Sequence, residues 1–128
     1  MSQTALQQRY MNDAVSTVSP AKLVLMLYDR LVKDLEDAEQ AINGRHIATA
    51  SDKLVHAQDI IMELHSGLNV DMWSGGPGLA SLYLWFHGEL IRANVAKDVK
   101  QVAAVRKQIE PLRDAWHQAA KAPVDAGA

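Results

Sequence analysis

Apolar residues recur at every third or fourth position in four successive parts of this chain, and no part shows the alternation of a strand. This spacing places apolar side chains on one face of an α-helix. We predict helices over residues 20–43, 45–67, 79–95 and 98–121. The connections between them are short and favour antiparallel neighbours, so the predicted fold is all-α: an antiparallel up-down four-helix bundle, with a short N-terminal segment positioned to cap it.

The predicted helix ends depend on capping residues. Ser19 precedes Pro20, and a hydroxyl followed by a proline is typical of a helix start. Asn43-Gly44 is expected to supply the left-handed residue that ends the first helix. Asp98 can cap the fourth helix while the Gln101 side chain reaches back to it.

Two stretches interrupt the helical pattern. Gly75-Gly76-Pro77-Gly78 is predicted to be a flexible, non-helical connection. Pro111 lies inside the fourth helix, where it removes a hydrogen bond at a cost of about 3 kcal/mol. Because the apolar pattern continues beyond Pro111, we expect a bend near Lys107 and not a helix end. The predicted organisation is a mobile N-terminal segment over 1–18, the bundle over 19–121 and a disordered tail over 122–128.

Composition limits the functions that can be proposed. With 128 residues, 48% of them hydrophobic, the chain can bury one core as a single domain. Thirteen basic against fifteen acidic side chains make nucleic acid an unexpected partner, because no positive surplus is present to bind phosphates. The chain has no cysteine and no apolar run long enough for membrane insertion, so we expect a cytoplasmic protein.

Three of the predicted helices carry more apolar surface than one core-facing stripe can hold. Leu23 to Tyr28 form an unbroken apolar run that points in every direction around its helix. Such surplus on a soluble protein usually marks an interaction site, although each residue could instead fill a broad core or form a homodimer seam. The surplus positions, and the predicted partner-binding residues, are Leu25 and Val32 in the first helix, Val55 and Met62 in the second, and Leu84, Ile91 and Val95 in the third.

Five short motifs, in order along residues 10 to 120, resemble the flagellar secretion chaperone family, FliS. The matching residues are Tyr10, Val18-Ser19-Pro20-Ala21-Lys22-Leu23 with Met26-Leu27-Tyr28-Asp29, Lys53-Leu54 through Ala57-Gln58-Asp59-Ile60-Ile61-Met62-Glu63-Leu64, Leu82-Tyr83 with Leu90-Ile91-Arg92-Ala93-Asn94, and Leu112-Arg113-Asp114-Ala115-Trp116. The chain departs from the family at Leu84-Trp85, where the usual pattern after Leu-Tyr is more polar.

The resemblance implies a cytoplasmic helical bundle that binds the C-terminal segment of newly made flagellin, prevents premature polymerisation and assists its export. It also admits the flagellar export apparatus, a co-chaperone or an anti-sigma regulator as further partners. Tyr10 matches the family's N-terminal tyrosine and is a further predicted partner-binding residue. We expect residues 1–18 to cover part of the groove in place of flagellin; the alternative is that Tyr10 packs permanently on the bundle.

Catalytic and metal sites are not expected, and neither is a cofactor. The Glu-x-x-His repeats of a di-iron bundle are missing, and the side chains of Asp52, His56 and Asp59 form a solvated face more readily than an ion site. A histidine phosphotransfer bundle is the alternative fold-compatible function, but neither His56 nor His87 is followed by the Lys-Gly that this resemblance requires. A purely structural homodimer is the other alternative.

Overall fold

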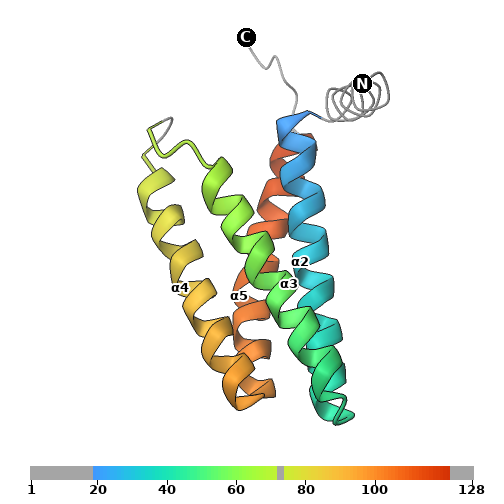
Figure 1. Cartoon of the computed structure of the whole chain (residues 1–128). Helices are drawn as coiled ribbons and strands as arrows, with labels where there is room; N and C mark the ends of the chain where they lie inside the picture. The colour runs from blue at the N-terminus through green and yellow to red at the C-terminus, as the bar shows by residue number, and fades with distance from the viewer. Residues whose placement is uncertain (1–18, 72–73, 122–128) are drawn as a thin grey trace, which may run out of the picture.

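A computed structural model describes residues 19–71 and 74–121, which form four helices packed as a bundle (Figure 1). Each helix packs against two neighbours: α2 against α3 and α5, and α4 against the same two helices. Successive helices run in opposite directions, so the predicted up-down bundle is confirmed. The predictions for 1–18 and 122–128 lie outside the described residues. The helices, labelled as in Figure 1, are α2 (Pro20–Asn43), α3 (Ile47–Gly67), α4 (Gly76–Ala96) and α5 (Val99–Lys121).

The core consists of the apolar residues that the helical spacing placed on the inner faces. All four helices contribute side chains that are almost completely buried, and their burial is the main force that holds the bundle together. The largest of them are Tyr28, Leu31, Leu35, Leu54, Ile61, Phe86, Leu90, Val102, Val105 and Ile109.

The start of α2 follows the prediction, whereas the turn after it does not. The Ser19 hydroxyl accepts a hydrogen bond from the Lys22 N–H at 3.1 Å, as expected of an N-cap. Gly44, however, has an ordinary φ of −86°, and the left-handed residue is Arg45, with φ of 60°. The prediction that Asn43-Gly44 supplies this conformation was therefore wrong by one residue, and α3 begins at Ile47, two residues later than expected.

The glycine-rich stretch before α4 is also different from the prediction. Gly76, Pro77 and Gly78 form the first turn of the helix and not a flexible connection. A proline is tolerated there because the first N–H groups of a helix have no partner within it. Gly76 is required because a Cβ atom on it would lie 2.6 Å from the carbonyl oxygen of Val70. The stretch thus allows close packing of the α3–α4 connection on the helix start.

The cap of α5 is confirmed in part. The Asp98 carboxylate accepts hydrogen bonds from the N–H groups of Lys100 and Gln101, but the Gln101 side chain bonds Glu89 of α4 at 3.2 Å and does not reach back to Asp98. The helix continues through Pro111, as predicted. The bend near Lys107 stays a prediction.

One acidic side chain, Asp34, is completely buried at the contact between α2 and α3. Its Oδ2 faces Nδ1 of His56 within hydrogen-bond distance, and its Oδ1 lies 3.2 Å from Nε of Arg30. Oδ1 nevertheless has no well-aligned hydrogen bond. Because a buried charge without a partner is strongly unfavourable, this carboxylate depends on its two neighbours, Arg30 and His56.

Arg45→Gly should stabilise the protein by about 0.5–1 kcal/mol, because glycine adopts positive φ without the steric cost of a side chain but loses more freedom on folding. Thermal unfolding followed by circular dichroism should show a midpoint a few degrees higher. Arg45→Ala is the control and should give no gain, since alanine keeps the Cβ atom. Equal midpoints for both variants would contradict the strain at Arg45.

His56→Ala should lower the free energy of unfolding by about 1–3 kcal/mol, because it leaves Asp34 buried with only Arg30 beside it. Urea titration measures this loss. The double variant Asp34→Leu/His56→Ala removes the carboxylate together with its partner and should be more stable than His56→Ala alone. A double variant no more stable than the single one would show that Asp34 is not the source of the loss.

Candidate partner-binding surface

Most of the predicted binding residues lie at the surface. Val55, Leu84, Ile91 and Val95 expose between 42% and 85% of their area, while Leu25 and Met62 are half-buried. Tyr10 lies outside the described residues. Val32 is only 2% exposed, so its placement on an outer surface was wrong.

Val32 is buried because α5 covers it. It lies seven residues before Glu39, and therefore on the same side of α2, and Glu39 accepts a hydrogen bond from Nη2 of Arg106 on α5 at 3.1 Å. Leu25, seven residues before Val32, shares this side. In a bundle where each helix has two neighbours, the buried arc is wider than the single stripe assumed from the sequence.

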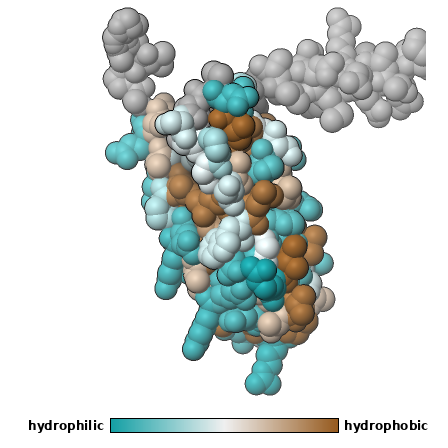
Figure 2. Space-filling view, turned by 90° about the vertical axis from the view of Figure 1, so that its left-hand side faces the viewer, coloured by the Kyte–Doolittle hydropathy of each residue, from teal (hydrophilic) through white to brown (hydrophobic). Residues whose placement is uncertain are grey.

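The exposed residues of α3 and α4 lie along the same seam. The Ser51 hydroxyl of α3 donates a hydrogen bond to the Asn94 side-chain oxygen of α4 at 3.3 Å, which identifies the facing sides of the two helices. Val55 and Met62 follow Ser51 by four and eleven residues, and Ile91 and Leu84 precede Asn94 by three and ten, so both rows border this seam. Figure 2 looks onto the side where α4 lies and shows hydrophobic residues gathered there among hydrophilic ones. We call Val55, Met62, Leu84, Ile91 and Val95 the α3–α4 surface.

Polar contacts cross the two seams that α2 forms, one with α3 and one with α5. Between α2 and α3, Asp37 lies 3.6 Å from Lys53, and Asp34 pairs with His56. Between α2 and α5, Glu39 pairs with Arg106, and Asp29 pairs with His117 at 2.8 Å.

The α4–α5 seam carries a hydrogen bond between Gln101 and the Glu89 carboxylate. Within residues 19–71 and 74–121, the α3–α4 seam is thus the one bordered by apolar rows without a charged group bonded across it.

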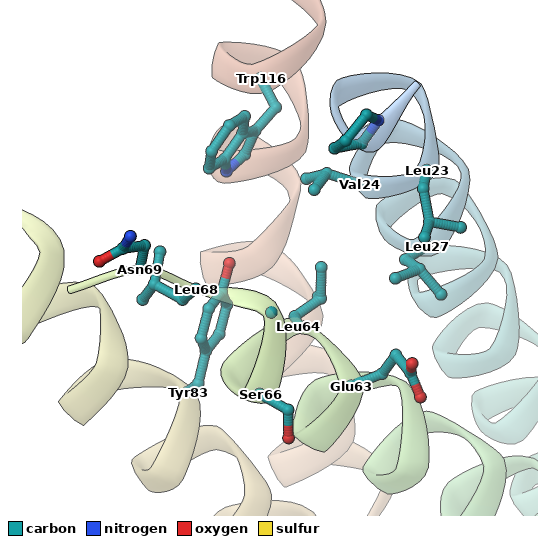
Figure 3. A pocket seen from close by; sticks show the side chains of 12 residues that line it. Leu23, Val24, Leu27, Glu63, Leu64, Ser66, Leu68, Asn69, Tyr83 and Trp116 are labelled. Atoms are coloured by element: carbon teal, nitrogen blue, oxygen red, sulfur yellow. The ribbon is translucent and has the colours of Figure 1, made fainter. Parts of the chain in front are cut away.

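A second apolar feature, which we call the end pocket, opens where α2 and α4 begin and α3 and α5 end (Figure 3). Its volume is about 540 Å³, within the range of roughly 300–1,000 Å³ that is typical of ligand sites. Its rim carries Glu63, Ser66 and Asn69. The apolar walls consist of Pro20, Leu23, Val24, Leu27, Leu64 and Leu68.

The apolar run from Leu23 to Tyr28 contributes three side chains to the end pocket. This run was predicted to carry surplus apolar surface, and Leu25 was its one predicted partner-binding residue. In the structure, Leu23, Val24 and Leu27 line the pocket, and Val24 and Leu27 also pack against the core. Trp116 also lines the pocket, where it is partly buried and packs against the core.

Two buried tyrosines pack together beside the end pocket, and Tyr83 is the one that lines it. The hydroxyl oxygens of Tyr28 and Tyr83 lie 2.6 Å apart, and the ring centroids of Tyr28 and Trp116 are 6.3 Å apart. Burial raises the pKa of both phenols above its usual value, and for Tyr83 the hydrogen bond that it shares with Tyr28 raises the pKa further. Both hydroxyls therefore stay protonated at neutral pH and act as neutral hydrogen-bonding groups.

The chemistry of these surfaces favours binding. In the part of the chain that the structure describes, no group of three histidine or acidic side chains is arranged to hold a metal ion. His56, considered with Asp52 and Asp59 as a weak ion site, faces Asp34 instead. None of the described helices is long and apolar enough to span a membrane. The two apolar features can cover a partner's hydrophobic residues.

Comparisons with known proteins agree on one family. The family model described as "Flagellar protein FliS" matches residues 1–123. The flagellar secretion chaperone FliS of Bacillus subtilis is 33% identical over 110 residues, 86% of this chain and 82% of that protein. The one of Vibrio cholerae is 29% identical over 107 residues, 81% and 77% of the two chains.

A solved structure has the same fold. The crystal structure of a bacterial flagellar chaperone aligns with a TM-score of 0.74 and 24% identity, covering 93% of this chain and 98% of that one. With a family model that spans nearly its whole length, and relatives that are chaperones and not enzymes, this chain belongs to the FliS family.

Proposed function

We propose that this chain is a cytoplasmic export chaperone that holds the C-terminal segment of flagellin, prevents its premature polymerisation and assists its secretion. Membership of the FliS family supports the export role, and the resemblance in motifs supports flagellin as client. The observation that carries the proposal is the α3–α4 surface, where apolar rows from two adjacent helices meet at the surface without a charged pair across them. This is the surface that an amphipathic client helix requires.

The entropy cost of ordering the client segment determines how large its interface with the chaperone must be. Fixing the backbone of a disordered segment costs about 1–2 kcal/mol per residue, so binding needs a long interface, about 1,000–3,000 Å² for coupled folding. The α3–α4 surface and the end pocket are the two apolar features of the described residues that such a client would cover. Ser66 connects them, because it lies four residues after Met62 on the same side of α3 and also lines the pocket.

Residues 1–18 are proposed to compete with the client. Pro20, the first residue of α2, lines the end pocket, so the preceding segment is attached directly at its rim. Leu6, Tyr10 and Ala14 share one helical face and could supply apolar side chains. A tethered competitor of this kind acts at high effective concentration and lowers the apparent affinity for the client.

Calorimetric titration of the chain with a C-terminal fragment of flagellin from the same organism tests the proposal. We expect a one-to-one complex with a large negative heat-capacity change, because apolar surface is buried as the fragment folds. Ile91→Ser should weaken binding by about 1–2 kcal/mol, roughly five- to thirtyfold in Kd. Met26→Ser is the matched control, since Met26 is 51% exposed but lies on α2, where it neither borders the α3–α4 seam nor lines the end pocket.

Two outcomes would contradict this function. Equal weakening by the two serine variants would show that the α3–α4 surface is not the binding site. A particle of twice the chain's mass in light scattering, unchanged by the fragment, would instead support a structural homodimer that uses Leu84, Ile91 and Val95.

Deletion of residues 1–18 tests the competing segment separately. The shortened chain should bind an environment-sensitive hydrophobic dye more strongly and the flagellin fragment more tightly, because the apolar surface is no longer covered. A shortened chain with unchanged dye fluorescence and unchanged Kd, and with an intact helical spectrum, would remove the proposed role of Tyr10 and its neighbours.

A further inference from the structure

The two tyrosine hydroxyls beside the end pocket carry two protons, and only one of these protons takes part in the hydrogen bond between them. One hydroxyl of Tyr28 and Tyr83 donates to the other across 2.6 Å, and the accepting hydroxyl keeps its own proton. No other residue of the described chain accepts a hydrogen bond from either hydroxyl. Both side chains are at least 98% buried, and in Figure 3 the Tyr83 hydroxyl points into the pocket between Leu64 and Trp116. An acceptor brought in by an occupant would satisfy this donor.

The charge at the rim of the end pocket is negative. Glu63 is the only charged residue among those that line the pocket, and none of the described residues forms an ion pair with it. In Figure 3 its carboxylate lies on the side of α3 that faces Leu27 of α2. A carboxylate beside apolar walls attracts a cationic group and repels an anionic one.

We propose that the end pocket receives one turn of the bound client segment, in which a bulky apolar residue is flanked by lysine or arginine. The apolar residue fills the space between Leu23, Leu27 and Leu64, the cationic side chain pairs with Glu63, and a backbone carbonyl of the turn accepts the free hydroxyl proton of the tyrosine pair. The volume of about 540 Å³ admits a turn of peptide, which is more than a single side chain needs. This inference depends on the proposed function, and it assigns a sequence preference to one part of that site.

Charge reversal on both sides tests the contact with Glu63. The probe is the C-terminal flagellin fragment, in which each lysine and arginine in turn is changed to glutamate. Glu63→Gln should weaken binding of the unmodified fragment about two- to fivefold at low salt, as for a solvent-exposed ion pair. Glu63→Lys should restore binding of one charge-reversed fragment and no other. Asp52→Asn, about three turns away on the same face of α3, is the matched control and should leave Kd unchanged.

The tyrosine contact has its own comparison. Tyr83→Phe removes the hydroxyl that lines the pocket and should weaken binding about two- to tenfold, the range expected for one net hydrogen bond. Tyr28→Phe leaves the Tyr83 hydroxyl free to donate to the client and should weaken binding less. Thermal midpoints of both variants show whether the bundle remains folded.

The outcomes separate this inference from the proposed function. If the fragment binds the wild-type chain, but no charge-reversed fragment is restored by Glu63→Lys, the cationic preference is overturned while the chaperone function stands. Equal losses for Tyr83→Phe and Tyr28→Phe would overturn the hydrogen bond to the client. If the fragment does not bind the wild-type chain at all, both the proposed function and this inference fail.

Discussion

Each helix of this bundle has only two neighbours, and this limit determines how much apolar surface the chain can hide. Side chains directed at the centre or at either neighbour are buried, as Val32 is beneath α5. Side chains outside that arc stay in water, however hydrophobic they are. Ile91 and Val95 lie outside it on α4, so their burial needs a further molecule. The apolar surface that remains is a direct consequence of the packing geometry.

Polar contacts are distributed unevenly among the four seams between neighbouring helices. This distribution separates the seams that are closed by polar pairs from the seam that is available to a partner. The two seams of α2 carry ion pairs, of which Glu39 with Arg106 is the most enclosed. These pairs add modest stability, but they also cover the underlying apolar residues with charge. On the opposite side, α3 and α4 are joined through the neutral contact of Ser51 with Asn94, and apolar side chains border it. A partner that approaches the bundle therefore meets charged pairs along the two seams of α2 and apolar side chains along the α3–α4 seam.

Much of the fold could be predicted from the sequence because helix formation depends on neighbouring residues. The spacing of apolar residues gave the four helices, and Ser19 gave the start of α2 to the residue. The predictions were wrong where residues that are distant in the sequence determine the local backbone conformation. Arg45 takes the left-handed conformation expected nearby, and Gly76 belongs to a helix because it packs on Val70. The candidate site was predicted less well. Val55 and Ile91 are exposed as expected, but the end pocket joins residues from four helix ends, and no local pattern indicates such a meeting.

The pairing of Asp34 with His56 also affects the register in which α2 and α3 pack. If α3 slid by one turn along α2, the surrounding leucines and alanines could repack with little loss, since they are similar in shape and chemistry. The carboxylate would then be enclosed without its imidazole, and that arrangement costs about 1–3 kcal/mol. A single acidic residue among apolar ones therefore penalises the shifted bundles that hydrophobic packing alone would accept. Asp34 thus defines the register of α3 along α2, while it contributes no surface to the partner.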